Sequence, residues 1–288
     1  MKCYRLKFII LAFIFNFCLV KQVYPQFYDK DTLYHPYHVN YWVTGSIIAA
    51  GLTLESIGVA WISNKSQILP GEIQNLDRTD ISPFDRWALN FDPSKRGKYE
   101  KLSSQLQTVI AFLPFVTLID PTIRKDWLDI LLMYAQTQAI TNNFYLYSPF
   151  GATFQNRLRP VVYYDAVDMG KRTEPNNRNS LYSGHVAACA EASFFTAKIF
   201  CDYHPELGMN KYLVYGAASI PPILMSYFRL GALAHFPTDL MVGFGVGALC
   251  GILVPEFHRI DDGKISLGLF SNPDATGLSL TWCTDLFN

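Results

Sequence analysis

A cation, a histidine and a carboxylate lie close together in the last third of the sequence. Arg229 is followed by five small or apolar residues and then by His235, and Asp239 comes four residues later. Pro237 suits the first turn of a helix but not its interior, so the sequence predicts a helix that starts near Phe236. In that turn Asp239 would reach back to His235, fix the tautomer of the imidazole and make its other nitrogen a better nucleophile or base.

Arg229 points this group toward phosphate chemistry, because its planar guanidinium offers a fork of donors to a phosphoryl group. The alternative reading is a capped helix junction next to a surface arginine. These three residues alone leave the two readings at roughly even odds, since a motif match is only a hypothesis.

Two upstream stretches favour the chemical reading. Ser183, Gly184 and His185 open an apolar run, so they place free backbone N–H groups and a histidine at the start of a helix, where an anion can bind. Arg159, followed by Pro160, adds a further cation. The sequence shows no metal-binding cluster beside these residues, so the set suits holding and cleaving a phosphoester without a metal or other cofactor.

Together these residues form three blocks that resemble the type 2 phosphatidic acid phosphatase family, which shares its core with vanadium haloperoxidases and bacterial acid phosphatases. The family pattern is Lys, six residues and Arg-Pro, then Pro-Ser-Gly-His, then Ser-Arg, five residues, His, three residues and Asp. The same order is kept here over residues 152–239, roughly a third of the chain. The departures are Ala152 in place of Lys, Tyr182 in place of Pro, and Phe228 in place of Ser.

The resemblance implies a role for each matching residue. His235 would attack phosphorus and form a phosphohistidine, with Asp239 orienting it, and His185 would protonate the leaving oxygen as a general acid. The residues that would hold the equatorial oxygens in the transition state, the last two through their backbone, are Arg159, Arg229, Ser183 and Gly184.

The departure at Ala152 keeps a non-catalytic reading open. Loss of a phosphate-binding lysine would cost on the order of two or three kcal/mol of transition-state stabilisation. Arg157, Lys171 or Arg172 could replace its charge, although nothing in the sequence shows that one of them does. The sequence therefore predicts an active phosphatase, with a non-catalytic phosphate-binding membrane protein as an alternative from a different class.

The surrounding sequence predicts helices and little sheet. Apolar stretches of helical character cover residues 41–62, 106–119, 127–140, 186–201, 212–228 and 240–254. In the last of these, Gly243, Gly247 and Gly251 recur at a spacing that lets two helices approach closely. Alternating apolar and polar residues on either side of 272–277 predict a hairpin. The expected fold class is all-α, a multi-helix bundle of the phosphatidic acid phosphatase and haloperoxidase type with a small C-terminal β-hairpin.

Three regions follow from this pattern. Residues 1–26 begin with three basic residues and continue in an apolar run, which predicts a signal peptide. No small-x-small cleavage site follows the run, so an N-terminal anchor is the alternative. Residues 27–258 would form the helical phosphatase domain that contains the catalytic blocks, and residues 259–288 the tail.

Composition narrows the class of protein. The 288 residues have a formal net charge of zero and no basic stripe, so nucleic acid is not an expected partner. Half of the residues are apolar, but a mean hydropathy of +0.12 is modest for a polytopic membrane protein. This value does not decide whether lipid or water surrounds the helices. The widely spaced cysteines between residues 189 and 283 predict buried thiols instead of a disulfide framework or a zinc site.

The number of membrane spans conflicts with the side of the membrane on which the site is expected. Spans at 41–62, 106–119 and 127–140 would deliver Arg159 to the cytoplasm, whether the leader is cleaved or kept as an anchor. In membrane members of the family that this sequence resembles, the catalytic loops are extracytoplasmic. Either two of the short helices do not span, or the enzyme is an exported bundle resting on a membrane. We expect an exported, membrane-associated or integral membrane protein with an extracytoplasmic site, and leave the number of spans open.

The predicted activity is metal-independent hydrolysis of a lipid-linked phosphomonoester or pyrophosphate. Apolar helices around the site favour a phosphatidate-like lipid, a polyprenyl pyrophosphate or a lipid A phosphate, without ranking them. A soluble periplasmic acid phosphatase of broad specificity is the nearest alternative, and vanadate haloperoxidase is disfavoured because the lysine is missing. The expected partners are therefore a phosphorylated lipid and a membrane, with the oligomeric state left open.

Overall fold

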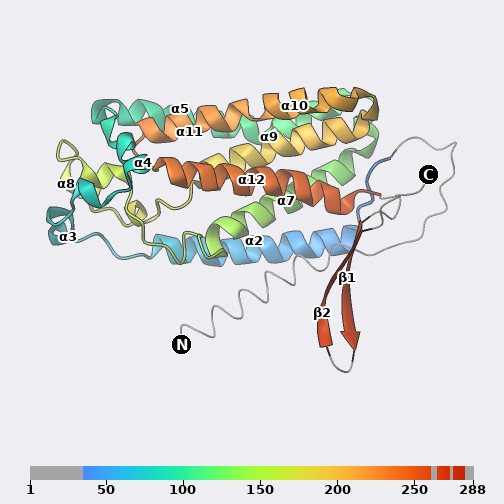
Figure 1. Ribbon diagram of the computed structural model, residues 1–288, viewed down its shortest axis with the longest axis horizontal. Coiled ribbons are helices and arrows are strands. Elements are labelled where there is room, and N and C mark those ends of the chain that lie inside the picture. The colour runs from blue at the N-terminus through green and yellow to red at the C-terminus, as the bar shows by residue number, and fades with distance from the viewer. Residues whose placement is uncertain (1–34, 261–264, 273–274, 283–288) are drawn as a thin grey trace.

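The computed structural model describes residues 35–260 and, by their backbone, two strands at 265–272 and 275–282. Long helices that run alternately in opposite directions form an all-α bundle, as the sequence predicts (Figure 1). The leader expected at residues 1–26 lies outside the described residues. The helices of the bundle are α2 (Tyr41–Ser63), α5 (Arg96–Ala111), α6 (Leu113–Val116), α7 (Trp127–Tyr147), α9 (Gly184–Tyr203), α10 (Lys211–Ala218), α11 (Ile220–Gly231) and α12 (Pro237–His258).

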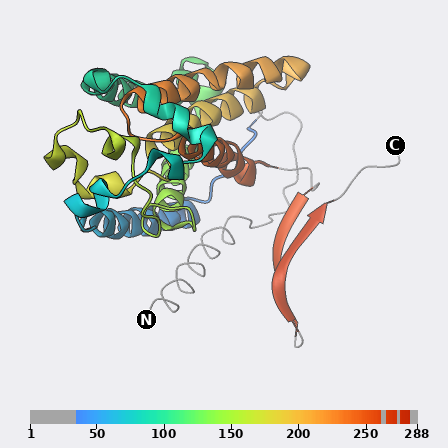
Figure 2. The ribbon, with the colours of Figure 1, turned by 60° about the vertical axis from the view of Figure 1, so that its left-hand side comes forward.

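Short elements gather at one end of this bundle, which Figure 2 brings forward. They belong to the two long connections, α2 to α5 and α7 to α9. The short helices of these connections are α3 (Pro70–Gln74), α4 (Pro83–Arg86) and α8 (Met169–Arg172), with 3₁₀ turns at Arg78–Asp80, Trp87–Asn90, Pro93–Lys95, Pro160–Tyr163 and Pro175–Arg178. At the opposite end the connections are shorter and contain 3₁₀ turns at Thr117–Ile119, Ile123–Asp126 and Pro205–Asn210.

Helix α9 is the centre of the bundle. It contacts α5, α7, α10, α11 and α12, and most of its side chains are buried. Small residues make this possible, because alanines, serines and cysteines let neighbouring helices approach from several sides at once. Cys189 and Cys201 on this helix are buried free thiols, as is Cys250 on α12, in agreement with the sequence-based expectation.

Three glycines of α12 make the closest approach to α9. A Cβ added to Gly243 would lie 2.6 Å from the carbonyl oxygen of Ser183, the residue that caps α9. One added to Gly247 or Gly251 would meet the carbonyl oxygen of Ala187 or Glu191 within that helix. Both series advance by four residues, so the two helices touch along matching faces. The four-residue spacing of these glycines therefore lets α12 approach α9 closely, as the sequence predicted.

Gly247→Ala is accordingly expected to destabilise the protein by at least about 1–3 kcal/mol, because the new Cβ would meet backbone that cannot move away as a side chain does. Gly245→Ala is the matched control in the same helix, since a Cβ there meets nothing within 4 Å. Thermal unfolding in detergent checks both variants. Equal melting temperatures for Gly247→Ala and Gly245→Ala would contradict this packing.

Helices α2 and α7 pack together through polar contacts that are spaced along both helices. Asn143 Nδ2 donates to the Gly51 carbonyl at 2.9 Å, and the Tyr147 hydroxyl donates to the Leu54 carbonyl at 2.6 Å. Asn142 Nδ2 lies 3.1 Å from Glu55 Oε1. These bonds satisfy polar groups that would otherwise face an apolar environment at a cost.

Three helical segments of the described chain are long and apolar enough to cross a membrane, namely Tyr41–Ser63, Pro93–Ile119 and Pro237–His258. These candidate spans differ from the three counted from the sequence. Helix α7 is not among them, and α12 is the most apolar of the three. On α2, Trp42 is 89% exposed and Trp61 42% exposed, and their separation of about 28 Å along the axis is close to the hydrocarbon thickness of a bilayer, about 30 Å. Interfacial aromatic residues at both ends are typical of a spanning helix. Membrane association follows from these helices.

The first and the last described residues of the bundle are hydrogen-bonded to each other. This contact lies at the end of the bundle opposite the short helices. The His38 N–H donates to the His258 carbonyl at 2.8 Å, and the Ile260 N–H donates to the Pro36 carbonyl at 2.9 Å. The start of α2 and the end of α12 therefore lie side by side (Figure 1). Beyond them, β1 (Ile265–Asn272) and β2 (Ala275–Trp282) pair antiparallel, which gives the hairpin predicted from the alternating pattern.

Candidate active site

The predicted site residues come from the α7-to-α9 connection, from the ends of α9, α11 and α12, and from the link between α11 and α12. All of them lie at the end of the bundle that carries the short helices. Arg159 precedes the 3₁₀ turn Pro160–Tyr163, and His185 lies in the first turn of α9. Arg229 is in the last turn of α11, and His235 follows it in the connection to α12. Each helix start follows from its local sequence, because Ser183 caps α9 and Pro237 opens α12 as expected.

His235 is buried and held in one tautomer. Its Nδ1 lies 2.7 Å from the Ser180 carbonyl oxygen, which can only accept, so the Nδ1 proton is donated and Nε2 keeps its lone pair. Burial, together with the cations Arg229 and Arg159, holds the pKa of His235 well below its usual range. The ring is therefore neutral at physiological pH, which is the form that a nucleophilic nitrogen requires.

Asp239 does not bond to His235, so the expected direct contact is wrong. Its Oδ2 accepts hydrogen bonds from the Phe236 N–H at 2.8 Å and from the Ser180 hydroxyl at 2.6 Å. The reason is local: a carboxylate in the first turn of a helix satisfies the free N–H groups at that helix start. Asp239 is linked to His235 through Ser180, which donates its hydroxyl hydrogen bond to Asp239 and accepts one at its carbonyl from the imidazole N–H.

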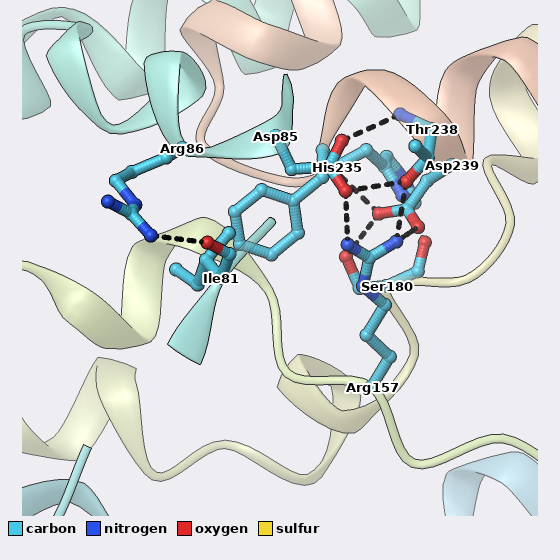
Figure 3. A network of polar contacts seen from close by, with 9 residues as sticks. Ile81, Asp85, Arg86, Arg157, Ser180, His235, Thr238 and Asp239 are labelled. Carbon is cyan, nitrogen blue, oxygen red and sulfur yellow. Dashed lines mark hydrogen bonds and ion pairs between the residues drawn. The ribbon is translucent and has the colours of Figure 1, made fainter. Parts of the chain in front are cut away.

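Arg157 is the hub of a network around Asp239 (Figure 3). Its Nη1 lies 2.5 Å from Asp239 Oδ1 and its Nη2 lies 2.7 Å from Asp85 Oδ2. Asp85 also accepts from the Thr238 N–H at 2.9 Å, so α4 is tied to the first turn of α12. The guanidinium lies over the Phe236 ring, 4.8 Å from its centroid. This network clamps the helix start that follows His235.

Asp85 and Ser180 are residues that sequence reasoning missed. Asp85 belongs to a Pro-Phe-Asp-Arg stretch that signals only a short helix, and Ser180 acts through its carbonyl as well as its side chain. A carbonyl acceptor leaves no trace in a sequence, because every residue has one. The acidic residue in the first turn of α4 was visible, but its partner lies 72 positions away.

Arg159 and Arg229 form an uncompensated pair of cations. Arg229 is almost fully buried, its Nη1 lies 3.2 Å from the Ser103 hydroxyl, and its Nε has no partner. The only hydrogen bonds of Arg159 are long ones of 3.4 Å to the Asn179 carbonyl, and within residues 35–260 neither arginine forms an ion pair. Burial is the main cause of a lowered pKa in both arginines, to about 10 for Arg229. Repulsion from Arg96 lowers the pKa of both further, and repulsion from Arg159 lowers that of Arg229. An anion would relieve this repulsion.

The donors at the start of α9 differ from those expected. The Ser183 N–H donates to the Asp239 carbonyl at 3.1 Å, so it ties α9 to α12 and is not available to a phosphate. The Ser183 hydroxyl accepts from the Val186 N–H at 3.4 Å, which caps the helix. The first N–H groups inside the helix, those of Gly184 and His185, have no helical acceptor and remain suited to an anion.

The same two arginines also lower the pKa of His185. Burial, with further lowering by Arg229 and Arg159, lowers its pKa to about 3. The imidazole is thus neutral in the anion-free protein. A bound phosphate would add negative charge beside the two arginines and offset their repulsion of a protonated His185, which favours the form that a general acid needs.

This depressed pKa predicts how stability depends on pH. In the unfolded chain His185 takes up a proton near pH 6.5, but in the fold it does so only near pH 3. The stability that its neutral form contributes is present above pH 6.5 and is lost as the pH falls toward 3, by on the order of a few kcal/mol. Melting temperatures of the unmodified protein and of His185→Gln, compared at pH 7 and pH 4, check this. A drop of the same size in both proteins would contradict the assignment.

The site contains no metal-type cluster in the part of the chain that the structure describes. Among these residues, no group of three or more His, Cys, Asp and Glu side chains could hold a metal ion. The polar atoms that converge on the site belong instead to arginines, histidines and backbone N–H groups, which suit a phosphate directly.

This chain is similar to a known protein family and to a solved structure. Residues 126–261 match the family model of the PAP2 superfamily, and that segment contains every candidate site residue from Arg159 to Asp239. Among solved structures, the chain is similar to the crystal structure of a transmembrane PAP2-type phosphatidylglycerolphosphate phosphatase from Bacillus subtilis, with 21% identity, a TM-score of 0.41, and coverage of 74% of this chain and 94% of that one. A comparison with curated protein sequences finds no match. Residues 126–261, just under half of the chain, are thus similar to the PAP2 superfamily.

Proposed function

We propose that this protein is a membrane-associated phosphatase that hydrolyses a lipid-linked phosphomonoester or pyrophosphate through a phosphohistidine, without a metal. The observation that carries the proposal is that two arginines without a counter-ion lie beside a neutral histidine. Arg159 and Arg229 lack a counter-ion, and beside them His235 is neutral with a free Nε2. A phosphate ester supplies the missing negative charge and the electrophile together.

In the proposed reaction, His235 Nε2 attacks phosphorus as the bond from phosphorus to the leaving oxygen breaks. His185, protonated once the anionic substrate is bound, gives its proton to that oxygen. Arg159, Arg229 and the Gly184 N–H hold the equatorial oxygens as charge develops. A water molecule then attacks the phosphohistidine, His185 takes its proton, and phosphate leaves with the imidazole restored.

The proposed substrate class rests on the apolar outer faces of the bundle. Exposed large apolar side chains lie on α2, α5, α6, α10, α11 and α12, and the site lies at one end of these helices. A lipid in the surrounding membrane would present its phosphate at this level. Phosphatidate-like lipids, polyprenyl pyrophosphates and lipid A phosphates all fit this description.

Phosphate release tests the function directly. The purified protein in detergent is given each of these lipid phosphates and, separately, a water-soluble aryl phosphate, all in the presence of a chelator. Chelator-resistant release from a lipid substrate supports the proposal. Equal release from the aryl phosphate without detergent would favour a broad-specificity acid phosphatase instead. Orthovanadate binding without release from any substrate would favour the non-catalytic phosphate-binding protein.

We also propose that the site faces the extracytoplasmic side. The start of α2 and the end of α12 lie at the opposite end of the bundle, so they would face the cytoplasm. Lys171→Cys at the site end and Lys125→Cys at the other end test this, because both lysines are exposed. In whole cells, with Cys3, Cys18 and Cys283 replaced by serine, an impermeant maleimide should label only Lys171→Cys. Labelling of Lys125→Cys alone would place the site in the cytoplasm.

A further inference from the structure

The family lysine is absent at Ala152, and two of the three cations that the sequence offered as replacements are engaged elsewhere. Arg157 is bound by Asp85 and Asp239. Arg172 donates to the Val162 carbonyl and pairs with Asp165 at 3.0 Å, and Lys171 is an exposed residue of α8. Arg157 and Arg172 are therefore not free to bind a phosphate at the site.

Lys65 lies next to Ala152 but has a structural role. Its Nζ donates to the Ala152 carbonyl at 2.6 Å and to the Gln155 carbonyl at 2.5 Å. The ammonium group is therefore hydrogen-bonded to the backbone of the loop. It supports the segment that leads to Arg159, and it does not supply the missing charge at the phosphate.

A further arginine, at the same end of the bundle, lies outside the segment that matches the family. Arg96 is the first residue of α5, and Ser103, which lies 3.2 Å from Arg229 Nη1, follows it by two helical turns on the same face. Between them, Tyr99 packs against Gly231 at the end of α11. This face of α5 therefore lies along the end of α11 that carries Arg229.

The guanidinium of Arg96 has no counter-ion. Its Nε is buried without a hydrogen-bond partner, and it forms no ion pair among residues 35–260. Arg96 repels the charged forms of both Arg159 and Arg229, so three guanidinium groups share one region. Glu100, one turn later on α5, attracts both arginines but is exposed and pairs with neither. Three uncompensated cations are favourable only when an anion joins them.

We propose that Arg96 supplies the third phosphate-binding cation, in place of the lysine lost at Ala152. This inference rests on the proposed function of the site. A guanidinium can donate two parallel hydrogen bonds to the oxygens of one phosphate, which an ammonium cannot. The charge comes from the first turn of α5, so phosphate binding also joins this helix to α9 and α11.

Orthovanadate binding tests the role of Arg96 without requiring turnover, because vanadate mimics the phosphoryl group. Arg96→Gln is expected to weaken orthovanadate binding at least about 10-fold, and Arg96→Lys to recover part of that loss. Lys101→Gln, which removes an exposed charge from the same helix, is the matched control and should bind as the unmodified protein does. Without an anion, Arg96→Gln should melt no lower than the unmodified protein, since the lost Nε has no partner.

The outcomes separate this inference from the proposed function. If Arg96→Gln folds and binds orthovanadate as tightly as the unmodified protein, Arg96 is not a ligand. A lower melting temperature without an anion, with unchanged binding, would assign Arg96 a structural role. If the unmodified protein binds orthovanadate and Arg96→Gln does not, but no phosphate ester is hydrolysed, the Arg96 site stands and the catalytic proposal falls. Failure of the unmodified protein to bind orthovanadate overturns both.

Discussion

His235→Ala is expected to lower kcat by at least about ten-thousand-fold, because it removes the buried, neutral imidazole that is the proposed nucleophile. The free Nε2 of His235 is the proposed attacking atom, and no other described side chain at the site has its proton fixed on the opposite ring nitrogen. KM for a lipid phosphate should change little, since Arg159 and Arg229 remain. Steady-state phosphate release in detergent measures both quantities.

The fold must survive for that result to count. His235→Ala removes the hydrogen bond to the Ser180 carbonyl, so His235→Asn is the second variant, because its amide can still donate there. His204→Gln is the matched control, since His204 lies at the other end of the bundle, bonded to Asp120 and Glu206. Full turnover by a folded His235→Ala or His235→Asn protein would disprove the nucleophile assignment.

Asp239→Asn is expected to lower kcat about 100-fold and to destabilise the protein by about 3–5 kcal/mol. The carboxylate accepts from Arg157 through Oδ1 and from Ser180 and the Phe236 N–H through Oδ2. An amide has one oxygen, which the Arg157 guanidinium would keep, and its nitrogen cannot accept the other two bonds. Freed from Asp239, Ser180 would no longer hold its carbonyl against the His235 imidazole. The catalytic loss is thus indirect, through the position and tautomer of the nucleophile.

Asp85→Asn is the matched control for this prediction. It removes the other carboxylate bound to Arg157 but leaves the bond between Asp239 and Ser180 intact. We therefore expect Asp85→Asn to lower the melting temperature while keeping most of the activity. Equal losses of kcat in the two variants, measured well below their melting temperatures, would show that Asp239 acts only by clamping Arg157.

The sequence by itself predicted the local features of this protein. The helix starts at Ser183 and Pro237, the glycine stripe of α12 and the C-terminal hairpin all appear where the sequence placed them. The reason is that caps, residue spacing and strand alternation are determined by neighbouring residues. The three blocks also named a family that the match over residues 126–261 supports.

Only the tertiary structure decided how these residues are connected. A first-turn carboxylate such as Asp239 can serve its own helix start or a nearby histidine, and the loop that carries Ser180 settled the choice. Arg157 was bound by Asp85 from a distant connection, while Arg96 reached the site along a helix outside the matched segment. Such pairings depend on which helix ends meet after packing, and no local pattern in the sequence encodes that.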